Sequence, residues 1–148
     1  MNKINDIKLI IVGDGPLRNY VLSYSRKLKN ITYVGKTDTP EIFYNCCDVL
    51  LFYTKFEERS RVIPEALGCG MTILSTPTND LILLKDRYKD IPILFIPYEP
   101  SKIAKFILRN VNKLKEIKMG RKQYIIKEQD SRYVRKQIIK VYKNILKI

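Results

Sequence analysis

The chain has 148 residues, a length that suits one hydrophobic core but not two. Hydrophobic residues make up 45% of it and charged residues 29%, which favours a folded domain over a disordered chain. No apolar run approaches the ~20 residues of a membrane-spanning helix, and the N-terminus lacks the apolar stretch of a secretory signal. We therefore expect a single domain over residues 1–148 of a cytoplasmic protein.

The residue types limit the available chemistry. The sequence contains no histidine, which excludes imidazole bases, histidine-activated nucleophiles and histidine-ligated metals. The three cysteines show no C-x-x-C spacing, so we expect buried thiols rather than a disulfide framework or a zinc site. No metal and no cofactor are expected. Any chemistry must therefore use carboxylates, lysines, arginines or backbone groups.

Short apolar runs alternate along the chain with segments of helical spacing. The predicted strands are Lys8–Val12, Ile31–Val34, Val49–Tyr53, Thr72–Ser75 and Ile93–Ile96. The predicted helices begin near Leu17, Pro40, Arg61, Ser101 and Ser131, and Thr76–Asp90 is predicted to be a polar connection. Continuous apolar strands that alternate with helices indicate a mainly parallel sheet covered on both faces. The predicted fold class is therefore α/β and Rossmann-like.

Positive charge gathers in the C-terminal part of the chain. Residues 1–100 contain 13 Lys and Arg against 12 Asp and Glu, whereas residues 101–148 contain 15 against 3. Both helices predicted in 101–148 have an apolar stripe opposite their lysines, so we expect them to pack on the core. The basic faces fit bulk solvent, an anionic membrane surface or a nucleic acid. Because no nucleic-acid-binding motif accompanies the charge, specific nucleic-acid binding is not expected.

The loops after the strands are the expected binding region, since ligands of such sheets bind beyond the carboxyl ends of the strands. Gly13 and Gly15, after the first strand, would let the backbone approach a ligand closely. No third glycine follows, and the second strand ends at Gly35 instead of an acidic residue. A nicotinamide cofactor is therefore not expected.

Two glutamates mark the loop and helix that follow the third strand. Glu57 lies in the loop, and Glu65 lies in the helix beside apolar residues. A carboxylate near an apolar face needs a partner, because an unpaired buried charge is costly. Two neighbouring sugar hydroxyls could donate hydrogen bonds to it, and Arg61 one turn earlier could form an ion pair instead. The residues alone leave both interpretations open.

Four segments, Leu9–Leu17, Ile31–Gly35, Asp48–Phe52 and Glu57–Gly70, occur in the order and at the spacing of a known family. With them, the chain from about Lys8 to Leu146 resembles the donor-binding half of a family 4 glycosyltransferase, also called the glycosyl transferases group 1 family. The resemblance implies the C-terminal half of a GT-B fold. It also implies retaining transfer of a sugar from a nucleotide-diphospho-sugar, without an obligatory metal.

The resemblance further implies which residues bind the donor. Glu65 would bind the ribose hydroxyls, and Glu57 would contact the donor sugar as the candidate catalytic residue. The glycine turn would face the nucleotide, and the residues at the end of the second strand would lie near the base. The implied donor-binding residues are Gly13, Gly15, Gly35, Lys36, Glu57, Glu58, Arg59, Ser60, Val62 and Glu65.

The sequence departs from the family pattern in one important respect. The family's acceptor domain and the first strand-helix unit of its donor domain have no counterpart before Lys8. By analogy the missing strand is central, so apolar strand edges should be exposed. We therefore expect a donor-binding domain that needs a second chain for transfer and does not catalyse it alone. The alternative is a non-catalytic interaction subunit, or a basic module that binds a membrane surface peripherally or a nucleic acid through residues 101–148.

Overall fold

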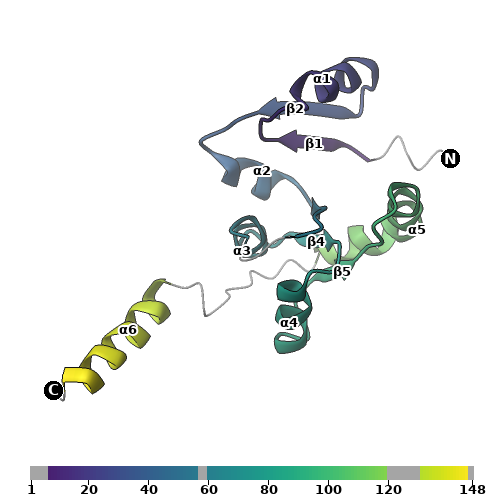
Figure 1. The fold of residues 1–148 in the computed structure, drawn as a ribbon. Helices are drawn as coiled ribbons and strands as arrows, with labels where there is room; N and C mark the ends of the chain where they lie inside the picture. The colour runs from purple at the N-terminus through teal and green to yellow at the C-terminus, as the bar shows by residue number, and fades with distance from the viewer. Residues whose placement is uncertain (1–6, 57–59, 120–130, 147–148) are drawn as a thin grey trace.

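The computed structural model describes residues 7–56, 60–119 and 131–146, in which strands and helices alternate (Figure 1). The first part of the order is β1 (Leu9–Val12), α1 (Arg18–Lys27), β2 (Ile31–Gly35), α2 (Pro40–Cys46), β3 (Val49–Phe52) and α3 (Val62–Gly68). It continues with β4 (Thr72–Ser75), α4 (Asn79–Arg87), β5 (Ile93–Phe95), α5 (Pro100–Met119) and α6 (Ser131–Leu146). The α/β class is confirmed.

The described strands form two parallel sheets instead of the single sheet that we expected. β1 pairs with β2, with Leu9 opposite Ile31, and β4 lies between β3 and β5. β1 and β3 therefore each have one hydrogen-bonded neighbour among the described strands. Leu9, Val12 and Leu51 of these two strands are partly exposed.

The hydrophobic core surrounds β4. This strand is buried along its whole length, because β3 and β5 cover its edges and helices cover its faces. One cluster joins residues of α3 and α4 to β4 and β5, and the other joins Leu74 of β4 to α5. The buried members are Ile63, Ala66, Leu67, Met71, Ile73, Leu81, Ile91 and Ile93 in the first cluster, and Leu74, Ile96 and Leu114 in the second.

Helix α4 lies where the sequence analysis predicted a polar connection, so that prediction was wrong. Leu81 is buried, and Leu84 and Tyr88 pack against the first core cluster. These three residues follow the spacing of one helix face, which polar neighbours such as Asp80 and Lys85 conceal in the sequence. Burial of this apolar stripe explains why the segment is helical.

The two C-terminal helices differ in how their apolar sides are covered. Phe106, Ile107 and Leu114 of α5 pack toward β4, as expected. In α6, by contrast, every residue from Ser131 to Lys143 is exposed, and Figure 1 shows the helix standing apart from the other elements. The expectation that α6 packs on the core is therefore wrong. No helix in the described parts of the chain is long and apolar enough to cross a membrane.

The unit formed by β1, α1 and β2 has little buried surface. No residue of α1 is buried, and its Leu17-to-Leu28 stripe, which includes Tyr20 and Tyr24, is exposed. Backbone hydrogen bonds link the two strands, and the Leu9 amide also donates to the Asn30 carbonyl oxygen at 2.9 Å. The unit therefore depends mainly on backbone pairing, whereas the buried core belongs to residues 63–114.

Candidate functional site

The glycine turn after β1 contacts the end of β2. Gly13 has a φ of 126°, a conformation that side-chain-bearing residues rarely adopt, and its amide donates to the Gly35 carbonyl oxygen at 2.8 Å. Gly35 is buried and has a φ of 80°. Lys36 follows it and is exposed. The structure thus brings together the four predicted residues Gly13, Gly15, Gly35 and Lys36, as their places at two neighbouring strand ends require.

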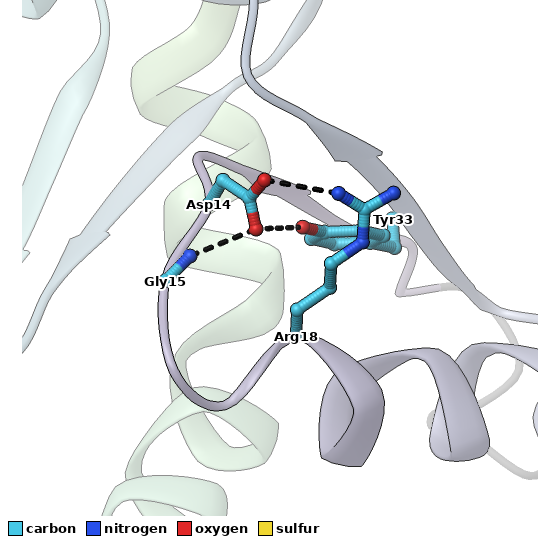
Figure 2. A network of polar contacts seen from close by, with 4 residues as sticks. All are labelled: Asp14, Gly15, Arg18 and Tyr33. Atoms are coloured by element: carbon cyan, nitrogen blue, oxygen red, sulfur yellow. Dashed lines mark hydrogen bonds and ion pairs between the residues drawn. The ribbon is translucent and has the colours of Figure 1, made fainter.

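Asp14 holds this turn through a network of hydrogen bonds (Figure 2). Its Oδ1 accepts from the Gly15 amide at 2.8 Å and from the Tyr33 hydroxyl at 3.1 Å, and its Oδ2 accepts from Arg18 Nη1 at 3.0 Å. The backbone bond from Gly15, the bond from Tyr33 and the positive charge of Arg18 hold the pKa of Asp14 below its ordinary value. The Asp14 carboxylate therefore fixes the shape of the turn by accepting hydrogen bonds from Gly15, Arg18 and Tyr33.

Sequence reasoning missed Asp14, Arg18 and Tyr33 as site residues. Asp14 was visible between two glycines, and Arg18, the first residue of α1, follows four residues later and forms an ion pair with it. Tyr33 lies 19 residues from Asp14, and only the parallel pairing of β1 with β2 brings them together. The first two residues could thus have been predicted from local spacing, but the third required the register of the sheet.

Glu65 lies in the first turn of α3 and is exposed. Its neighbours Ile63, Ala66 and Leu67 face the core, so the carboxylate lies on the opposite, solvent side of the helix. The Tyr44 hydroxyl of α2 donates to Glu65 Oε2 at 3.0 Å. In the described structure the partner is therefore Tyr44, and the predicted alternative of an Arg61 ion pair is wrong.

The Tyr44 hydroxyl keeps its proton to a higher pH than an ordinary tyrosine. Its partial burial, followed by the hydrogen bond to Glu65 and the negative charge of that residue, raises the pKa of Tyr44 to about 12. The phenol consequently stays protonated across the neutral range and keeps donating to Oε2. The other carboxylate oxygen, Oε1, remains available to accept further hydrogen bonds.

A buried threonine and two tyrosines fix the carboxyl ends of β3 and β4. Thr76 is fully buried, and its Oγ1 accepts from the Thr54 amide at 3.1 Å. The Tyr53 hydroxyl donates to the Tyr98 carbonyl oxygen, and the Tyr98 hydroxyl donates to the Pro77 carbonyl oxygen, both at 2.9 Å. These bonds determine where the loop that leads to α3 leaves the sheet. Only the fold reveals them, because the partners are 21 to 45 residues apart.

The remaining predicted residues belong to the segment between β3 and α3. Ser60 and Val62 are partly buried where the chain enters α3. Glu57, Glu58 and Arg59 lie outside the described residues. The glycine turn belongs to the sheet of β1 and β2, whereas Ser60, Val62 and Glu65 follow a strand of the other sheet. The predicted donor site is thus divided between the two sheets.

The cysteines are less buried than the sequence analysis predicted. Cys46 is exposed, and Cys47 and Cys69 are partly buried. The Sγ atoms of Cys46 and Cys47 are 3.9 Å apart, and in the described parts of the chain none of the three cysteines forms a disulfide. Among the described residues, no cluster of three or more Cys, Asp or Glu side chains could hold a metal ion.

Comparison with known proteins agrees with the four sequence segments. The model of the family described as glycosyl transferases group 1 matches residues 1–113. The chain therefore belongs to this family. It is also similar to the N-acetylgalactosamine-N,N'-diacetylbacillosaminyl-diphospho-undecaprenol 4-alpha-N-acetylgalactosaminyltransferase of Campylobacter jejuni subsp. jejuni, with 28% identity over 74 residues. That alignment covers 48% of this chain and 20% of the relative, so the chain spans about a fifth of the relative's length.

Proposed function

We propose that this chain binds a nucleotide-diphospho-sugar and forms the donor-binding part of a retaining, family 4 glycosyltransferase with a GT-B fold. The observation that carries the proposal is the exposed Glu65 carboxylate, which Tyr44 holds at one oxygen. It follows the carboxyl end of β3, where parallel sheets bind their ligands. Membership of the glycosyl transferases group 1 family makes a sugar donor the natural ligand.

The geometry of Glu65 suits a pair of neighbouring hydroxyl groups. Tyr44 donates to Oε2, so Oε1 and the second lone pair of Oε2 can accept from the two ribose hydroxyls of a nucleotide. Hydrogen bonds to an ionised carboxylate are stronger than those between neutral groups. Tyr44 acts as a positioning residue, because its hydroxyl fixes the side chain before the ligand arrives.

Other residues of the proposed site bind the rest of the donor. The backbone of Gly13 and Gly15 faces the nucleotide, and Gly35 with Lys36 lies near its base. Val62 and the segment from Glu58 through Arg59 to Ser60 contact the sugar and phosphates. Glu57 is proposed as the catalytic residue, in contact with the donor sugar. No metal and no separate cofactor take part in this proposal.

We further propose that transfer requires a second polypeptide, which supplies the acceptor site. The division of the donor residues between two sheets supports this proposal, because β1 and β3 each have an edge without a neighbour among the described strands. A strand between them would bring the glycine turn and Glu65 into one sheet. Such a domain would be cytoplasmic, and catalysis by the isolated chain is not expected.

Calorimetric titration with UDP, GDP, ADP and their sugar conjugates tests the donor proposal. The conjugates include an N-acetylhexosamine, because the relative is named as an N-acetylgalactosaminyltransferase. We expect one nucleotide to bind and Glu65→Gln to weaken its affinity about tenfold to more than a hundredfold. Tyr44→Phe should weaken nucleotide affinity less, since it removes the hydrogen bond that orients the Glu65 side chain but leaves the carboxylate in place.

Glu41→Gln is the matched control, since Glu41 is an exposed glutamate on neighbouring α2. It should leave nucleotide affinity unchanged. Equal affinity of the Glu65→Gln and parent proteins would refute the role of Glu65. If a folded protein binds none of the nucleotides, the donor proposal fails and the alternative of a non-catalytic interaction subunit is favoured.

A further inference from the structure

Helix α2 ends in two adjacent cysteines, which we call the thiol pair. Cys46 is the last residue of the helix, and Cys47 follows it in an extended conformation, with φ −99° and ψ 161°. Neighbouring side chains do not face each other within a regular helix, and in a strand they point to opposite faces. The change from helical to extended backbone instead brings the two Sγ atoms to 3.9 Å from each other. The local fold thus holds two thiols side by side.

The thiol pair is accessible from solvent and is anchored to the protein. The Cys46 side chain is exposed, and its thiol donates to the Phe43 carbonyl oxygen at 3.6 Å. Cys47 is partly buried and packs against the first core cluster, and its amide donates to the same carbonyl oxygen at 3.0 Å. A ligand can therefore reach the exposed thiol, while packing holds the neighbouring residue in place.

We propose that the thiol pair is a binding site for a soft metal ion, Cu(I), which both thiolates ligate. Thiolate sulfur selects soft ions of this kind. Two sulfurs 3.9 Å apart can each lie about 2.3 Å from one ion between them, which is the length of a zinc–thiolate bond. Binding replaces both S–H bonds by S–Cu bonds and releases both protons to solvent. No electron is transferred, so no oxidant or reductant takes part in the binding step.

Other uses of the thiol pair fit this geometry less well. A disulfide usually joins α-carbons about 4.4–6.8 Å apart, whereas those of adjacent residues are only about 3.8 Å apart, so a bond between Cys46 and Cys47 would be strained. Structural zinc sites need four ligands, and the described part of the chain has no group of three or more Cys, Asp or Glu side chains that could hold an ion. Cu(I) forms stable complexes with two thiolates alone.

Transfer of Cu(I) from its coloured bicinchoninate complex to the full chain tests this proposal. The titration is made without oxygen, and ascorbate keeps the copper reduced. We expect the parent protein to bind a single Cu(I) ion per chain and to decolourise the complex. Cys46→Ser and Cys47→Ser should each weaken copper affinity by more than about a hundredfold, the upper end of what loss of an outer-shell partner costs a metal site.

Cys69→Ser is the matched control. It leaves the chain with as many thiols as either of the other variants, but it keeps the thiol pair intact. Cys69 is partly buried and directly follows α3. This variant should keep the parent's copper affinity and stoichiometry. X-ray absorption at the copper edge should show coordination by two sulfurs in the parent and in the control, a result that does not depend on how well the other variants fold.

The fold should contribute to copper affinity, because it places the two sulfurs near each other before the ion arrives. The unfolded chain keeps the cysteines adjacent but does not hold them at this separation. Cu(I) should therefore raise the melting temperature of the parent and of Cys69→Ser, since a ligand that binds the folded chain more tightly stabilises it. The melting temperature of Cys46→Ser should not respond to Cu(I).

Several results would overturn the proposal. One is failure of the folded parent to take copper from bicinchoninate. Another is a similar loss of affinity in all three serine variants, which would show that copper binds whichever thiols are present. A melting temperature that bound copper leaves unchanged would show that the unfolded chain binds the ion equally well, so that the end of α2 does not form the site. Nucleotide titration is a separate measurement, so failure of the donor proposal leaves this one standing.

Discussion

At the scale of single residues, the Tyr44–Glu65 hydrogen bond should be visible in the titration of the phenol. Partial burial and the neighbouring carboxylate raise the pKa of Tyr44 to about 12. A raised folded-state pKa stabilises the fold fully below the ordinary value of 10, and this contribution is lost as the pH rises from 10 toward 12. Glu65→Gln should lower the pKa of Tyr44, because it removes the negative charge but not the burial.

Phenolate absorbance as a function of pH measures this effect. Subtracting the Tyr44→Phe titration from that of the parent isolates the contribution of Tyr44. The isolated signal should rise well above pH 10 in the parent and at lower pH in a Glu65→Gln background. A midpoint near 10 in the parent would contradict the hydrogen bond to Glu65.

Asp14 should make the glycine turn sensitive to acid. Its pKa is lowered chiefly by the hydrogen bond from the Gly15 amide, so it stabilises the fold above the ordinary value of 3.8. This stabilisation is lost as the pH falls through the folded-state pKa. Asp14→Asn should lower the melting temperature at neutral pH, and the difference from the parent should shrink in acid.

Thermal melting at a series of pH values checks this prediction. Asp38→Asn provides the comparison, because Asp38 is an exposed aspartate in the loop after β2. A difference between the Asp14→Asn variant and the parent that stays constant from neutral pH into acid would rule out the proposed charge network.

At the scale of elements, Gly35 ends β2 in a conformation that other residues adopt only with strain. An added Cβ would meet the Tyr33 ring at ordinary contact distances, so the cost of Gly35→Ala comes from its φ of 80° rather than from a clash. We expect a destabilisation of ~1–3 kcal/mol in chemical denaturation. Gly68→Ala, in α3 with open space around the new Cβ, should be neutral or slightly stabilising. Equal effects would contradict the strain argument.

Leu67 tests the first core cluster. It is fully buried in α3, so Leu67→Ala should cost ~2–5 kcal/mol of unfolding free energy through lost burial and the cavity that remains. Leu83 of α4 is 66% exposed, and Leu83→Ala should change stability by less than ~0.5 kcal/mol. Denaturant titration of the two variants compares identical substitutions on helices. Similar losses would mean that the core does not surround β4.

The strands were the most predictable elements. All five predicted strands occur within one or two residues of their observed bounds, because short apolar runs that end at Gly13 or Gly35, or begin after Asp48, leave few alternatives. α4 was missed because polar residues interrupt its apolar stripe. The α/β class was predictable from the alternation of strands and helices. The separation into two sheets was not, because it depends on which strands pair, and strand pairing leaves no local pattern in the sequence.

The candidate site was only partly predictable for the same reason. Gly13, Gly35 and Glu65 were identified from local motifs and from their family resemblance. The partner of Glu65 was not, because Tyr44 belongs to another helix and reaches the carboxylate through the packing of α2 against α3. Contacts between segments that are distant in sequence depend on tertiary packing. The spacing of residues in a single sequence does not predict them.

At the scale of the whole molecule, the core belongs to one of the two sheets, whereas the proposed donor site is divided between them. The buried apolar side chains lie between Ile63 and Leu114, in the part that contains β3, β4 and β5. The glycine turn belongs to the part without them (Figure 1). A ligand that contacts both Gly13 and Glu65 would therefore have to hold the two parts in one arrangement. Donor binding would then depend on how the two parts are placed relative to each other as well as on the loops that carry Gly13 and Glu65.

The scarcity of buried side chains around β1, α1 and β2 also has a consequence for amide hydrogen exchange. Regions with few buried apolar contacts open locally at a free energy below that of global unfolding. Amides of Tyr33 and Val34 in β2 should therefore exchange well before those of Ile73 and Leu74 in β4. Equal protection of the two strands would show that the chain unfolds as one cooperative unit. A bound nucleotide that contacts both parts should slow exchange in β2 most of all, because it stabilises the closed form of the region that opens first.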